Sequence, residues 1–166
     1  MREKTKLGGI FNVKCLDKKG NLKWEADAKN LVVDEGLNHQ LDLLFESSTS
    51  QIDPWYIGLT DSTPTVDATD TLGSHTGWAE VTDYTGDRKE FVNTRSNQTV
   101  DNSASKASFA INADSTTVGG AFICSATSGN TGTLLCAASF SGGDKNADNG
   151  DTLEVQYTYS ASDDNA

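Results

Sequence analysis

The chain has few of the residues that usually carry catalysis, redox chemistry or metal binding. Its 166 residues include two histidines, three cysteines and one methionine. It contains no GxSxG elbow, HExxH pair or phosphate-binding glycine loop. We therefore expect that the protein is not an enzyme and holds no cofactor or metal. A glycosidase-like pair of carboxylates stays open, because the chain has 24 acidic residues.

Long apolar runs and basic surface patterns are also missing. No stretch of about 18 apolar residues is present, so no membrane-spanning helix is expected. The first residues lead into no signal-peptide hydrophobic region, which predicts synthesis and retention in the cytoplasm of the producing cell. The net charge of −11 gives an acidic body that repels phosphate, so nucleic acid is not an expected partner.

Positive charge is concentrated at the N-terminus. Residues 1–29 hold eight Lys and Arg against four acidic residues, so the rest of the chain is strongly acidic. We expect residues 1–9 to form a flexible basic arm in which Arg2, Lys4 and Lys6 contact an acidic protein surface. A solvated end without a binding role is the alternative.

The composition favours strands joined by turns, with 15 glycines and only 36% hydrophobic residues. The centre of the predicted fold is a hairpin over 117–140, whose two apolar runs flank a turn at 127–132. Both runs are apolar on both faces, which predicts two central strands covered from both sides. Cys124 and Cys136 lie almost symmetrically about the turn, so they are either a cross-strand disulfide or two small buried residues. A reducing cytoplasm favours the second reading.

Period-two alternation predicts further strands and hence the fold class. The alternation is clearest in a first hairpin over 10–27 and a last strand over 153–159. With the remaining runs we expect eight or nine strands in an all-β antiparallel β-sandwich or jelly-roll-like domain over 10–159. Residues 160–166 are expected to be a frayed acidic tail. The other expected strands cover 55–59, 78–81, 88–93 and 105–111.

Residues 34–45 form the one expected helix. Asp34 suits the N-cap position, and four apolar residues recur at helical spacing: Leu37, Leu41, Leu44 and Phe45. We expect this stripe to pack on the sandwich, with His39 exposed on the polar side.

A calcium-like segment and one aromatic residue are further candidate sites. In residues 142–151, oxygen-bearing side chains alternate at Asp144, Asn146 and Asp148, as in a calcium loop. The EF-hand pattern then needs Gly and Glu where this chain has Asn149 and Val155, so we interpret the segment as a turn-rich connection. Among the aromatic residues Trp78 is the best candidate for a surface contact, because it adjoins the long polar loop at 60–77.

Several short segments, in this order and spacing, resemble a family of small structural proteins of tailed bacteriophages. The resemblance covers most of residues 30–159, and residues 1–29 lie outside its strongest part. These pieces are Asn30–Leu37, Trp55–Leu59, Asp70–Glu80, Tyr84, Arg88, Ser105–Phe109, Gly119–Phe122, Ser128–Leu134 and Gly150–Leu153.

The resemblance implies a capsid decoration (cement) protein that binds the outside of the assembled shell and reinforces it. The expected partners are the major capsid protein and the chain itself, and symmetry at three-fold axes favours a homotrimer. The alternative is a tail or head-fibre component that binds a host receptor or glycan through Trp78 and the loop at 60–77. The family offers no catalytic motif to carry over.

Overall fold

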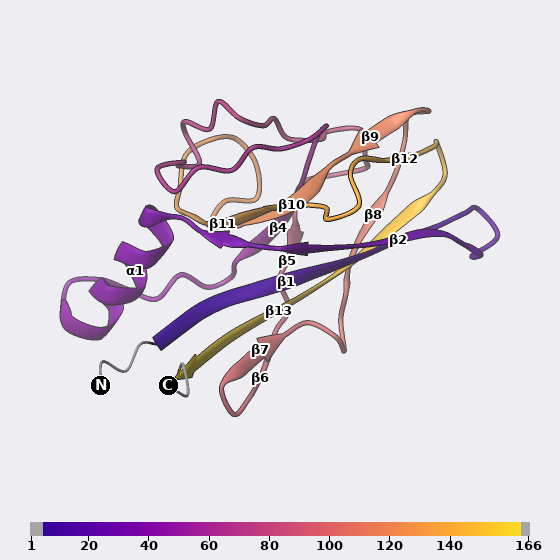
Figure 1. Cartoon of the computed structure of the whole chain (residues 1–166). Helices are drawn as coiled ribbons and strands as arrows, with labels where there is room; N and C mark the ends of the chain where they lie inside the picture. The colour runs from indigo at the N-terminus through magenta and orange to yellow at the C-terminus, as the bar shows by residue number, and fades with distance from the viewer. Residues whose placement is uncertain (1–4, 164–166) are drawn as a thin grey trace.

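The computed structural model describes residues 5–163 and shows antiparallel sheets packed as a β-sandwich (Figure 1). The all-β fold class predicted from the sequence is confirmed. The described part holds thirteen strands and one helix, and every strand pair in it is antiparallel. The strands missed from the sequence are two or three residues long, too short to show a pattern of their own.

The larger sheet is built around the last strand. Its order is β2-β1-β13-β7-β6, and β8 also pairs with β13. β1 and β2 are the predicted first hairpin, and their inward side chains include Phe11, Val13 and Ala28. The strands are β1 (Thr5–Leu16), β2 (Leu22–Lys29), β6 (Thr94–Ser96), β7 (Thr99–Asp101), β8 (Ala107–Ala110) and β13 (Thr152–Asp163).

The second sheet contains the predicted central hairpin, now β10 and β11. Its order is β3-β11-β10-β4-β5, and a separate two-stranded sheet pairs β12 with β9. The strands are β3 (Leu31–Val32), β4 (Tyr56–Thr60), β5 (Lys89–Glu90), β9 (Thr116–Val118), β10 (Gly120–Cys124), β11 (Leu134–Ser139) and β12 (Lys145–Ala147).

The central hairpin is covered from both sides, as predicted. The main core lies between the two sheets and includes Phe11, Phe109 and Tyr157. A second, smaller cluster lies on the outer face of β10 and β11, where Phe122 packs beneath Leu72 and Trp78. Its cover is the irregular segment that follows β4, which folds back over the hairpin (Figure 1).

The register of this hairpin separates the two cysteines. Ile123 is opposite Cys136, and Cys124 is opposite Leu134, so the two thiols belong to different clusters on opposite faces of the sheet. All three cysteines are free and buried. The cross-strand disulfide considered from the sequence is therefore wrong, and the reading as small buried residues is confirmed.

The expected arm and tail are partly wrong. Thr5–Gly9 belong to β1, and Ser160–Asp163 belong to β13, and these two segments pair with each other from Thr5↔Asp163 onward. A neighbouring strand supplies hydrogen-bond partners that neither end has alone, which is why these residues are ordered strand rather than arm or tail. Residues 1–4 and 164–166 lie outside the described residues.

Candidate interaction surface

The helix α1 (Asp34–Phe45) has the predicted bounds but the opposite orientation to the one expected. Its only fully buried residue is Gly36. A Cβ atom at Gly36 would lie 2.3 Å from the carbonyl oxygen of Leu135, so the helix backbone rests directly on β11. The N-cap residue is Val33 without a side-chain cap bond, so the expected Asp34 cap is wrong.

A second contact fixes this orientation of α1. The carboxylate of Glu35 accepts a hydrogen bond of 2.7 Å from the backbone N–H of Leu134. Because successive helix residues are about 100° apart, this contact and Gly36 together determine which side chains face the sandwich. His39 and Gln40 turn toward the sandwich, and Gln40 accepts a hydrogen bond of 2.7 Å from the hydroxyl of Tyr159.

The predicted apolar stripe is consequently exposed rather than packed. Leu41, Leu44 and Phe45 are 56%, 74% and 77% exposed, and Leu37 is also exposed. We call Leu37, Leu41, Leu44 and Phe45 the apolar flank of α1. The adjoining flank is polar and carries Asp34, Asn38 and Asp42, and α1 contains no Lys or Arg. An apolar patch bounded by polar residues is typical of a protein–protein contact.

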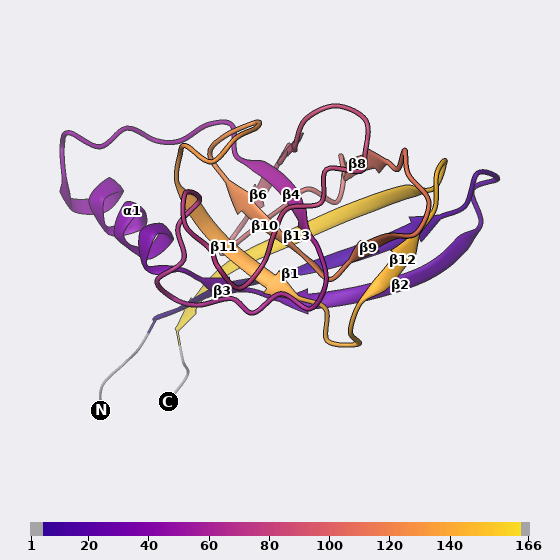
Figure 2. The ribbon, with the colours of Figure 1, turned by 90° about the horizontal axis from the view of Figure 1, so that it is seen from above.

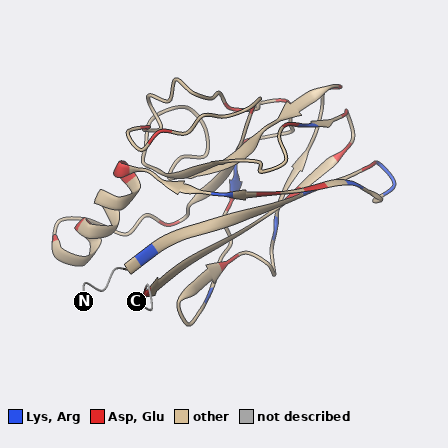
Figure 3. Cartoon of the chain, viewed as in Figure 1, with Lys and Arg blue, Asp and Glu red and all other residues tan. Residues whose placement is uncertain are grey.

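The apolar flank lies at one end of the molecule. Figures 1 and 2 both place α1 at the end where β1 begins and β13 ends, whereas the β1–β2 turn lies at the other end. Lys6 is at this α1 end, exposed on β1 and opposite Ser162. Figure 3 shows this positive charge at the start of β1, separate from the positive charge at the β1–β2 turn. The predicted contact residues Arg2 and Lys4 lie outside the described residues.

Trp78 is not a surface residue. It is 6% exposed, and its indole N–H donates a hydrogen bond of 3.1 Å to Asp70. One face of its ring stacks on His75 at 3.7 Å, and the ring also contacts Phe122. The expectation of an exposed Trp78 is therefore wrong. Together with the loop at 60–77, Trp78 covers the outer face of the hairpin. This contact joins segments that are distant in the sequence, so no local sequence pattern predicts it.

Two residues of the phage resemblance, Glu80 and Arg88, form an ion pair in which Arg88 is buried and Glu80 is half-buried. Arg88 donates two hydrogen bonds of 2.7 Å to Glu80, and it donates further bonds to the carbonyls of Ala126 and Gly129 in the hairpin turn. Its guanidinium also lies over the ring of Phe122 at 5.2 Å. Arg88 therefore holds the covering segment against the central hairpin, so Arg88 and Glu80 stabilise the fold.

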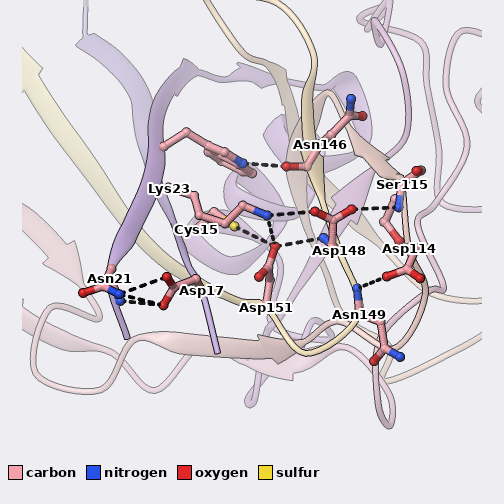
Figure 4. Close-up of polar contacts among 12 residues, drawn as sticks. Cys15, Asp17, Asn21, Lys23, Asp114, Ser115, Asn146, Asp148, Asn149 and Asp151 are labelled. Carbon is pink, nitrogen blue, oxygen red and sulfur yellow. Dashed lines mark hydrogen bonds and ion pairs between the residues drawn. The ribbon is translucent and has the colours of Figure 1, made fainter. Parts of the chain in front are cut away.

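The calcium-like segment has its oxygens engaged by protein donors (Figure 4). Asp148 pairs with the ammonium of Lys23 at 3.0 Å and accepts a bond from the N–H of Ser115. Lys23 also pairs with Asp151. Hydrogen bonding by Lys23 lowers the pKa of Asp148, and bonding to Asp151 and Asp148 raises the pKa of Lys23. The segment is thus a connection tied to β2 at Lys23.

Asp144, another oxygen of this segment, bonds elsewhere. Its carboxylate accepts bonds of 2.6 Å and 2.9 Å from the backbone N–H and the hydroxyl of Thr63. Over residues 5–163 no group of three or more His, Cys, Asp or Glu side chains is placed to hold a metal ion. In the same range no helix combines the length and apolar character that a membrane crossing requires.

The open end of the sandwich contains a cavity next to α1. Its volume is about 220 Å³, and it extends from α1 to both sheets. Apolar and aromatic side chains dominate its wall. The lining residues are His39, Gln40, Leu43, Gln51, Trp55, Phe91, Asn93, Val100, Leu135, Tyr157 and Tyr159. Leu43 of α1 lines the cavity and is also partly exposed to solvent.

Comparison of the chain with protein-family models, with curated proteins and with solved structures finds no match. The apolar flank of α1 is therefore the structural feature on which a functional proposal rests.

Proposed function

We propose that the protein is a non-enzymatic structural protein of a tailed-bacteriophage virion that binds the outer surface of the capsid and stabilises it. The observation that carries the proposal is the apolar flank of α1, which is exposed at one end of an otherwise well-packed sandwich. The resemblance of residues 30–159 to small phage structural proteins supplies the identity of the partner. The major capsid protein is that partner, and the virion exterior is the location after synthesis in the host cytoplasm.

The apolar flank provides binding energy of a useful size. Fully burying a leucine or phenylalanine side chain contributes about 1.5–3 kcal/mol. Leu44 and Phe45 are both largely exposed, so covering them alone offsets part of the entropy lost on association. A protein that binds only the assembled shell stabilises that shell by mass action.

A homotrimer at the three-fold axes of the shell is our proposed assembly. Each copy would then present its own α1 end to the shell. In this arrangement Lys6, with Arg2 and Lys4, adds charge attraction toward acidic groups of the capsid protein.

The alternative, a tail or head-fibre component that binds a receptor or glycan, has less support. It depended on stacking by Trp78 and on a free loop at 60–77. Trp78 is buried and that loop packs over the central hairpin, so neither offers an aromatic platform.

The test is binding to capsids, imaged by cryo-electron microscopy. Purified protein is mixed with undecorated expanded capsids and with proheads of the phage that encodes it. We expect regular density on the expanded shell and at least a tenfold loss of affinity for the double variant Leu44→Ser, Phe45→Ser. Both residues are exposed, so thermal unfolding of the free variant should be unchanged.

Leu22→Ser is the matched control. Leu22 is 55% exposed, but it lies at the start of β2, at the end of the molecule away from α1 (Figure 2). It should bind capsids like the wild type. Bare shells in both samples, or equal binding by the double variant, would overturn the proposal.

A further inference from the structure

The larger sheet carries a groove at the α1 end of the molecule. Its lining comes from the beginning of β1, the end of β13 and the last residue of β2, and Figures 1 and 2 show these ends of β1 and β13 at the α1 end. We call it the basic groove, because it contains two lysines and no acidic residue. The lining residues are Lys6, Leu7, Gly8, Gly9, Ile10, Lys29, Thr158, Ser160 and Ser162.

The strand register places this groove on the outer face of the sheet. Ile10 is paired with both Lys29 and Thr158, so these three side chains share one face. The next residue, Phe11, is fully buried in the core, so the side chain of Ile10 points away from the core. Ile10 is 45% exposed and gives the groove an apolar contact surface.

Gly8 makes the groove hollow. It lies on the same face as Lys6 and Ile10, two residues from each, and it has no side chain. Apart from its chain neighbours, a Cβ atom at Gly8 would meet only Asn30 Oδ1, at 3.7 Å. The space above Gly8 is therefore open to side chains of another molecule.

The lysines of the groove are available to a partner. Lys6 and Lys29 are exposed, and neither forms an ion pair within residues 5–163. The chain has a net charge of −11, so an exposed surface with two lysines and no acid differs from most of it. Such a surface attracts a partner that combines apolar and acidic side chains.

The helix α1 of this same chain has that composition. Exposed carboxylates of Asp34 and Asp42 adjoin its apolar flank, and α1 contains no Lys or Arg. Neither carboxylate forms an ion pair in the described part of the chain. The apolar flank therefore complements Ile10, and the two carboxylates complement Lys6 and Lys29.

Both surfaces lie at one end of the molecule, so two copies can exchange them. When α1 of one copy lies in the basic groove of a second, a two-fold axis places the second α1 in the first groove. The dimer then contains the same apolar and charged contact twice. Two α1 helices placed directly against each other would bring acidic residues together, which opposes that arrangement.

We propose that a second copy of this chain covers the apolar flank in the free protein, in a two-fold dimer in which α1 of each copy lies in the basic groove of the other. Pairing removes an exposed apolar patch from water. The dimer does not depend on capsid binding. Its competition with the shell for the same flank does rest on the proposed function, and there the free dimer separates as the shell binds each copy.

The test is sedimentation equilibrium of the full chain over a hundredfold range of concentration. We expect the mass to rise toward that of two chains. Leu44→Ser with Phe45→Ser changes α1, and Gly8→Gln fills the groove without touching α1. Each should weaken the dimer at least tenfold, whereas Leu22→Ser, at the other end of the molecule, should dimerise like the wild type.

Charge reversal tests whether the two surfaces meet. Lys29→Glu and Asp42→Lys should each weaken the dimer about fivefold at low ionic strength, because repulsion replaces attraction in both contacts. An equimolar mixture of the two variants should recover dimerisation. In the mixed dimer one contact keeps the original charges, and the other pairs the new glutamate with the new lysine.

Thermal unfolding of each variant checks that these surface changes leave the fold intact. A monomer at every concentration, a dimer that neither the α1 variant nor Gly8→Gln weakens, or a mixture that does not recover would each overturn the proposal. Capsid binding separates this result from the proposed function. A dimer that leaves capsids bare contradicts only the proposed function, and a monomer that binds capsids contradicts only the dimer.

Discussion

At the scale of single residues, the cysteines show how burial controls chemistry. Burial, with a smaller contribution from Asp151, raises the pKa of Cys15 to about 12, and burial raises that of Cys136 to about 11. Burial also raises the pKa of Cys124. The reactive form of a cysteine is the thiolate, so all three side chains are inert while the protein is folded.

We predict that none of the three thiols reacts with Ellman's reagent at pH 8 in the native protein, and that all three react in denaturant. A native thiol that reacts within minutes would contradict this.

The raised pKa of the buried thiols also makes the stability of the protein depend on pH. Since the unfolded thiol ionises near pH 9 and the folded Cys15 near 12, the free energy of unfolding should fall as the pH rises through this range. Urea unfolding at pH 8 and pH 10 measures it.

At the scale of elements, α1 shows that a close backbone contact can outweigh an amphipathic pattern. Its apolar stripe is regular enough to predict a packed face, yet the face that packs is the one that carries Gly36. Only a residue without a side chain lets the helix backbone approach the carbonyl of Leu135.

Gly36→Ala should therefore destabilise the protein, although alanine is the better helix former. The added Cβ atom would lie 2.3 Å from a backbone oxygen that cannot rotate away. We expect the free energy of unfolding to fall by about 1–3 kcal/mol, measured by urea unfolding. Asn38→Ala, on the exposed polar flank of the same helix, is the control and should be neutral or slightly stabilising. A neutral Gly36→Ala would contradict the close contact.

Elements could be predicted from sequence where the information is local. The apolar pattern is long enough to predict five strands, β1, β2, β10, β11 and β13, and the helical spacing of apolar residues predicts α1. β6, β7, β9 and β12 have three polar or mixed residues each, and they are strands only because a neighbour pairs with them. The burial of Trp78 and the orientation of α1 both depend on contacts between distant segments. For that reason the sequence predicts that the apolar flank of α1 is buried and that Trp78 is exposed. The structure shows the reverse in both cases.

At the scale of the whole molecule, one exposed positive charge lies at the same end as the apolar flank of α1. Lys6 is exposed near the start of β1, at the end where α1 presents its apolar flank. Lys19 is equally exposed, but it lies in the β1–β2 turn at the other end. The two lysines therefore form a matched pair for testing which end docks.

We predict that Lys6→Glu lowers capsid affinity several-fold at low ionic strength, and that the loss shrinks as salt screens the charges. Lys19→Glu makes the same charge change and should leave the affinity unaltered. Sedimentation of capsids with bound protein at two salt concentrations measures both variants. Equal losses for the two variants would show that net charge, rather than the α1 end, governs binding.

The position of β13 has a consequence for how the chain is made. This strand lies at the centre of the larger sheet and pairs with β1, β7 and β8. Among the described strands it is the last to be synthesised, whereas its longest partner, β1, is the first. Until residues 152–163 have been synthesised, β1 can therefore pair only with β2, and its other edge stays unpaired. A chain that stops before residue 152 lacks this strand and cannot build the larger sheet.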